Sequence, residues 1–196
     1  MREKTKGILK PKYYWIVSFA LASLAMWVLF ALARVLSFEK YILLAGDSFE
    51  IYAADIRMFV RSILNGESIW YSFAVQMGMN TALSVAFKLF SPFNLLYLIF
   101  PNADINIVTA AIIILKTGTA AACFQLFCSK VLKNNSFTSV LFALFYAMNS
   151  YVVIYCVINF MWLDGVYRLP VVAMAVYRAV HENKCGRGLC GSNRML

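Results

Sequence analysis

Charged residues and histidine are scarce in this sequence, and their scarcity argues against the common types of soluble enzyme. Only 14% of the 196 residues are charged, and no hydrophilic stretch is long enough to fold as a separate soluble domain. The single histidine, His181, lies in a basic segment, where no Ser-His-Asp arrangement can be built around it. There is no glycine-rich phosphate loop and no dinucleotide fingerprint. Cys185 and Cys190 make a poor zinc site without two further ligands, so we expect no cofactor.

Apolar residues are abundant instead. They make up 62% of the chain, which is more apolar surface than one soluble core of this size can bury. The net charge of +9 does not predict nucleic-acid binding, because apolar runs separate the basic segments. The sequence therefore predicts an all-α, polytopic helical protein of the cell membrane, in contact with membrane lipid.

Four apolar segments are predicted to span the membrane, because an apolar helix rising ~1.5 Å per residue must cross a hydrocarbon core of roughly 30 Å. The first is too long for a signal peptide, and no small-residue cleavage motif follows it. The fourth is short, and Pro170 falls in its first turns, where proline is tolerated. Gly118 and Ala122 give the second segment a small-residue face for helix packing. The predicted spans are residues 13–36, 105–128, 137–160 and 164–180.

Basic residues predict how these spans are oriented. Residues 1–12 are basic, so the N-terminus is predicted to be cytoplasmic by the positive-inside rule. Lys130 and Lys133 place the link between the second and third spans on the same side, as does the basic tail 181–196. These assignments agree only if residues 81–100 do not cross. Residues 37–104 then form one extracytoplasmic loop, in which 81–100 re-enters the membrane or lies flat on it.

Another interfacial helix is predicted over residues 47–64 of this loop. Asp47 can cap its first turn, with Glu50 three residues later as in a capping box, and Asn65-Gly66 supplies the stop. At about 100° per residue, the charged side chains fall on one narrow stripe over an apolar body. This charged stripe consists of Glu50, Arg57 and Arg61.

A series of short motifs follows the first span. In order, they are Gly46-Asp47, Asn65-Gly66-Glu67-Ser68, Tyr71-Ser72, Gly78, Asn80, Ser91-Pro92-Phe93-Asn94-Leu95-Leu96, Lys116, Phe145-Tyr146-Ala147 and Asn159 ahead of Trp162-Leu163-Asp164. Over about residues 46–180 this order resembles the N-terminal part of the bacterial YfhO family, whose large polytopic members are similar to class C glycosyltransferases. The resemblance implies transfer of sugar from a polyprenyl-phosphate carrier to lipoteichoic acid or a related envelope polymer.

Members of that family are several times longer than this chain. The resemblance therefore predicts that the chain is an N-terminal fragment, that its tail is truncated or frameshifted, and that it is inactive alone. In the class C pattern an acid in the first outer loop is the catalytic base, which implies this role for Asp47. Asp164 is the second candidate catalytic acid.

The departing phosphate in such a transfer needs positive charge, and guanidinium groups match phosphate oxygens. We assign Arg57 and Arg61 to this role from their chemistry and not from the resemblance. Trp162, near Asn159, is placed either to stack on a sugar or to anchor at the membrane interface. The predicted substrate-binding residues are Glu50, Arg57, Arg61, Asn159 and Trp162.

Structural alternatives stay open for these residues. Asp47 and Asp164 fit helix caps equally well, and the arginines fit a stripe that faces lipid headgroups. A divalent metal between the two acids is a further option.

Lys116 is predicted to face the protein interior, with no partner evident in the sequence. Because intramembrane charge and interrupted helices also mark transport proteins, the alternative function is a non-enzymatic transporter or flippase fragment, or an accessory subunit.

Overall fold

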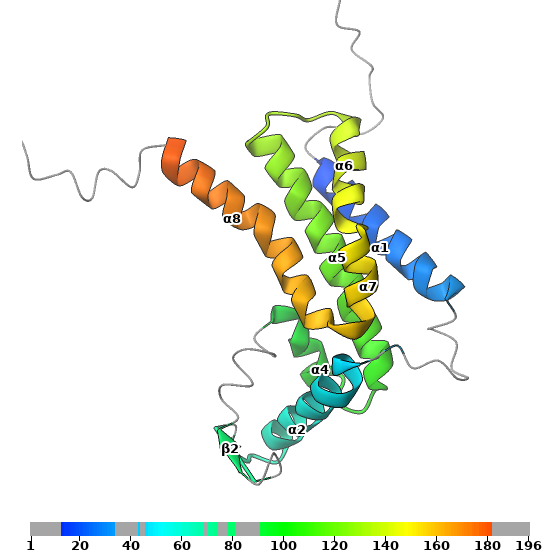
Figure 1. Cartoon of the computed structure of the whole chain (residues 1–196), viewed down its shortest axis with the longest axis vertical. Helices are drawn as coiled ribbons and strands as arrows, with labels where there is room; N and C mark the ends of the chain where they lie inside the picture. Colours follow the sequence, from blue (N-terminus) through cyan, green and yellow to red (C-terminus); the bar gives the residue numbers. More distant parts are fainter. Residues whose placement is uncertain are drawn as a thin grey trace, which may run out of the picture.

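A computed structural model describes residues 13–33, 43, 46–68, 70–73, 78–80 and 91–181. Most of this described chain is helical, which confirms the predicted all-α class (Figure 1). The elements are α1 (Tyr14–Leu32), the π-helical η2 (Ser48–Tyr52), α2 (Ala53–Leu64), β1 (Tyr71–Ser72), β2 (Met79–Asn80), the 3-10 helix η4 (Pro92–Asn94), α4 (Leu95–Ile99), α5 (Ile105–Lys130), α6 (Phe137–Ala147), α7 (Ser150–Ile158), the 3-10 helix η5 (Phe160–Trp162) and α8 (Leu163–His181).

Three helical stretches of the described chain are long and apolar enough to cross a membrane. They are α1, α5 and the run of α6 and α7 from Phe137 to Ile158. The predicted fourth span corresponds to α8, which is not among them; it carries Asp164, Arg168 and Arg178. In Figure 1, α8 leans away from the other helices toward its C-terminal end. That α8 crosses the membrane therefore stays a prediction.

Helix α5 is the centre of the bundle and packs against α1, α6 and α8. Gly118 explains how closely α1 approaches, because a Cβ at this position would collide with the Ser23 hydroxyl of α1 and press on the Phe19 ring. Small residues allow two helix backbones to come close together in a membrane. The packing role predicted for Gly118 is thus confirmed.

The stretch predicted as the third span, residues 137–160, consists of two helices, because α6 ends at Ala147 and α7 begins at Ser150. Asn149 causes the interruption: its side-chain oxygen accepts from the Val152 backbone N–H at 2.9 Å, and its side-chain nitrogen donates to the Tyr146 carbonyl at 2.8 Å. Asparagine side chains compete with helical hydrogen bonds in this way and favour helix starts. The two helices still follow one another along one side of α5 (Figure 1).

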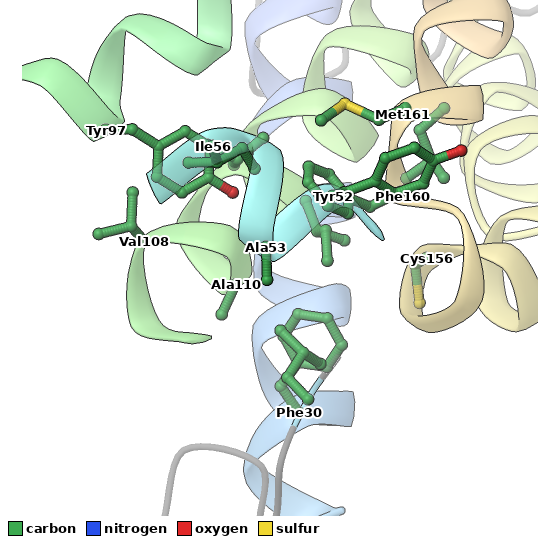
Figure 2. Close-up of a cluster of buried hydrophobic side chains, with 14 of the residues drawn as sticks. Phe30, Tyr52, Ala53, Ile56, Tyr97, Val108, Ala110, Cys156, Phe160 and Met161 are labelled. Carbon is green, nitrogen blue, oxygen red and sulfur yellow. The ribbon is translucent and has the colours of Figure 1, made fainter. Parts of the chain in front are cut away.

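One end of the bundle gathers α2, α4, η5 and the N-termini of α5 and α8; we call it the α2 end (Figure 1). A cluster of buried apolar side chains packs α2 against the other helices at this end. Figure 2 shows Tyr52 and Ile56 beside Phe160, Tyr97 and Val108, which come from η5, α4 and α5. The Tyr52 and Phe160 rings meet edge to face, with centroids 6.1 Å apart. Helix α2 is therefore held by the bundle and does not lie loosely beside it.

The residues that follow α2 partly match the prediction. The predicted stop is confirmed, because α2 ends at Leu64 with Asn65 as its C-cap and Gly66 at a φ of +69°. Residues 81–90 of the predicted interfacial segment lie outside the described residues, and its remainder forms η4 and α4. Two residues of β1 pair antiparallel with β2, a short ladder that the sequence did not indicate.

Candidate functional site

Asp47 lies exposed at the α2 end, where the chain enters η2. The capping role predicted for it is wrong: its own backbone is helical, and its side chain makes no cap hydrogen bond. Its Oδ2 instead accepts from the Asn159 side-chain nitrogen at 3.4 Å. The neighbouring Ser48 hydroxyl donates to the Ile158 carbonyl at 2.8 Å, and so satisfies a free carbonyl at the end of α7. These two bonds fix the start of η2 on the end of α7.

Asn159 and Trp162 belong to the turn between α7 and α8, residues 159–162. Asn159 is 5% exposed, and its side-chain oxygen has no hydrogen-bond partner in the described part of the chain. Trp162 is 47% exposed and stacks on Tyr155 at a centroid distance of 5.2 Å. One face of the indole is therefore already covered. The structure brings Asn159 to Asp47, and places Trp162 on the same turn.

Asp164, in the first turn of α8, is the partner of Lys116 that the sequence left open. Lys116 Nζ lies 2.7 Å from Asp164 Oδ1, and the lysine side chain is fully buried. The same Nζ donates to the Phe160 carbonyl at 3.3 Å. Ser91 donates to Asp164 Oδ1 at 3.2 Å, and Arg168 lies 3.5 Å from Oδ2. The prediction that Lys116 faces the protein interior is confirmed.

The two candidate acids thus sit on either side of one turn but in different electrostatic surroundings. Asp164 is neutralised by a buried ammonium and also lies at the positive end of a helix dipole. Asp47 is hydrogen-bonded to a neutral amide and forms no ion pair among the described residues. Of the two carboxylates, Asp164 therefore has cationic partners, whereas Asp47 has a neutral one.

Tyr52 is a further side chain near Asp47, and sequence reasoning missed it. Burial raises the pKa of its hydroxyl, and the negative charges of Asp47 and Asp55 raise that pKa further. Tyr52 therefore stays protonated near neutral pH. The apolar pattern of residues 51–60 indicates a buried face, but it does not show that one of its rings comes close to Asp47.

The charged stripe predicted on α2 lies further along the helix. Arg57 and Arg61 follow Asp47 by about 15 and 21 Å of helix, and both line a groove between α2 and the start of α5. The side chain of Glu50 lies outside what the structure describes. Of the predicted site residues, Asp47, Asn159 and Asp164 therefore lie around one turn together with Lys116, and we call these four residues the acid cluster. Trp162 belongs to the same turn, whereas Arg57 and Arg61 lie in the groove.

A bridging metal is not indicated by the described side chains, which include no group of three or more His, Cys, Asp or Glu that could hold one. Both oxygens of Asp164 already face cations, Lys116 and Arg168. A divalent ion between Asp47 and Asp164 therefore stays an untested prediction.

The family model described as "Bacterial membrane protein YfhO" matches residues 18–187, which includes the acid cluster and the groove. No curated protein matches the chain. No solved structure matches it either.

Proposed function

The chain belongs to the YfhO family of bacterial membrane proteins, and from this premise we propose that it is a membrane-embedded glycosyltransferase or part of one. The proposed donor is a sugar carried on a polyprenyl phosphate. The proposed acceptor is a cell-envelope polymer such as lipoteichoic acid. The reaction takes place at the α2 end, which we expect to be extracytoplasmic.

In the proposed step, the Asp47 carboxylate takes the proton of an acceptor hydroxyl while the hydroxyl oxygen bonds to the anomeric carbon of the sugar. The bond between this carbon and the phosphate oxygen breaks. Its electron pair leaves with the carrier, which becomes a lipid phosphate monoester. The proton then passes from Asp47 to water.

One observation carries this assignment: Asp47 is exposed and bound to the neutral Asn159 amide, whereas Asp164 is held by buried Lys116. A base must be free to accept a proton, and Asp47 fits that need. Asp164 acts through Lys116 as a positioning residue, because Lys116 also binds the Phe160 carbonyl next to Asn159. The Asn159 side-chain amide, which orients Asp47, is thereby held in place.

The test replaces the proposed base. In membranes that carry the protein in its native assembly, we expect Asp47→Asn to lower sugar transfer by about 100-fold or more, as for loss of a general base. Asp47→Glu keeps the carboxylate and should retain part of the activity. The matched control is Glu67→Gln, which removes an exposed acid outside the cluster. Transfer from a radiolabelled lipid-linked sugar is the measurement; full activity of Asp47→Asn would refute the assignment.

A transport function is the alternative, and the interruption between α6 and α7 favours it. Interrupted helices and intramembrane charge occur in transport pathways, and Lys116 lies in α5 opposite α8. Transport predicts movement of lipid-linked sugar across sealed vesicles without formation of a new glycosidic bond. Detection of that bond in the transfer assay therefore distinguishes the two.

A further inference from the structure

A groove of about 500 Å³ lies between α2 and the segment that leads from α4 into α5. Its volume is within the roughly 300–1,000 Å³ of typical ligand sites. The lining includes the buried apolar side chains of Ile56, Val60 and Val108, with the buried ring of Tyr97. Figure 2 shows Ile56, Tyr97 and Val108 near one another, each from a different helix. These side chains, which we call the apolar floor, come from three elements, whereas polar atoms make up most of the remaining exposed lining.

Two arginines line the groove beside this floor. Arg57 and Arg61 are exposed, one helical turn apart on α2, and neither forms a hydrogen bond or ion pair within the described part of the chain. Like charges at this spacing repel each other, and an anion bound between them would remove the repulsion. Guanidinium forks suit phosphate oxygens in particular.

Asp104 is the acid that lines the groove, and it already has a role. Its Oδ1 caps α5 by accepting from the Asn106 backbone nitrogen at 2.7 Å and from the Asn106 side-chain nitrogen at 3.0 Å. The described lining thus has two guanidinium groups against one carboxylate that is occupied at a helix N-terminus. An anion is the ligand that this charge balance favours.

The position of the groove indicates where the anion comes from. Ile105 and Asn106 in its wall belong to the first turn of α5, a 26-residue helix long and apolar enough to span a membrane. The groove therefore opens at the level where lipid headgroups lie. Two arginines above an apolar floor suit a lipid phosphate better than free phosphate, because free phosphate gains nothing from apolar contacts.

We propose that this groove binds the phosphate end of a lipid phosphate monoester. Arg57 and Arg61 share the phosphate, and the apolar floor takes the first part of the lipid chain. A monoester phosphate carries about −1.5 to −2 charges at neutral pH, which matches two guanidinium groups better than the single charge of a phospholipid diester. Identifying this lipid as the carrier released after sugar transfer rests on the proposed function. The separation from Asp47 along α2 suits a site that receives the carrier after the reaction.

The test measures binding by the purified full chain in detergent micelles, with farnesyl phosphate as the probe and calorimetric titration as the readout. We expect Arg57→Ala/Arg61→Ala to weaken binding at least about tenfold, because hydrogen bonds to charged groups are lost. Arg178→Ala is the matched control, since it removes an exposed arginine near the C-terminus of α8, far along that helix from the α2 end. This variant should bind farnesyl phosphate as the unchanged protein does. Farnesol, inorganic phosphate and phosphatidylglycerol should each bind at least about tenfold more weakly than farnesyl phosphate.

Equal binding of farnesyl phosphate by the double variant would overturn the proposal. Equally tight binding of inorganic phosphate or phosphatidylglycerol would overturn it too, because the site would then not select a lipid monoester. Asp47→Asn separates this proposal from the proposed function, since it should bind farnesyl phosphate normally. If Asp47→Asn also retains sugar transfer while the double variant loses binding, the lipid site stands and the proposed catalytic base fails.

Discussion

At the scale of single residues, Lys116 determines how the acid cluster is built. Its ammonium contacts both Asp164 and the Phe160 carbonyl, and so ties α5 to the turn that carries Asn159. The sequence predicted that Lys116 is interior, because a charge in an apolar span is costly toward lipid. It did not reveal the partner, because Asp164 lies on another helix and only the packing of α5 against α8 brings the two together.

Breaking this pair should destabilise the protein. We expect Lys116→Met to cost about 3–5 kcal/mol, because Asp164 keeps its charge while losing its buried partner. Lys116→Met/Asp164→Asn should recover part of this loss, since no unpaired charge remains. Arg168→Ala is the comparison, as its contact to Asp164 is exposed and worth at most about 1 kcal/mol. Thermal unfolding in detergent is measured for these three variants and for Asp164→Asn alone; strictly additive effects of the two single substitutions would show that the pair is not coupled.

At the scale of helices, Pro170 lies in the interior of α8 and not, as the sequence predicted, in first turns that tolerate proline. A contact from Tyr146 explains how α8 accommodates it. Proline has no N–H, so the Val166 carbonyl four residues earlier loses its helical donor. The Tyr146 hydroxyl of α6 donates to that carbonyl at 2.7 Å instead. We expect Tyr146→Phe to cost about 1–3 kcal/mol, the typical loss when a buried acceptor is left without a partner.

Pro170→Ala supplies the missing N–H, and therefore provides an internal check on this explanation. In that background Tyr146→Phe should cost clearly less, because the Val166 carbonyl regains its own helical donor. Tyr151→Phe, at an exposed tyrosine, is the control and should change little. Thermal unfolding midpoints give the comparison; the same loss with and without Pro170 would mean that the hydroxyl acts elsewhere.

Apolar length was enough to predict the three helical stretches that are long and apolar enough to cross a membrane, because this property depends on composition averaged over many residues. Features set by a few polar atoms were not predicted. Asn149 interrupts the third stretch through two side-chain hydrogen bonds, and Ser48 anchors η2 on the Ile158 carbonyl. The sequence did not link Asp47 to Asn159, whereas in the structure the Asn159 side-chain nitrogen donates to Asp47 Oδ2 at 3.4 Å.

At the scale of the whole molecule, sidedness connects the fold to the proposed function. The acid cluster and the groove share the α2 end, and the link between α5 and α6 lies at the opposite end of α5. The basic residues of this link, Lys130 and Lys133, predict that it is cytoplasmic. The α2 end should then face outward, where an envelope polymer is accessible.

Cysteine labelling tests this orientation in a background whose native cysteines are replaced by serine. Glu67→Cys, just beyond α2, and Leu132→Cys, between α5 and α6, both introduce exposed thiols at opposite ends of the bundle. In intact cells a membrane-impermeant maleimide should label Glu67→Cys, whereas Leu132→Cys should react only after permeabilisation. The reverse pattern would place Asp47 and both groove arginines in the cytoplasm. Transfer to an external polymer would then be impossible at this site, because acceptor and base would lie on opposite sides of the membrane.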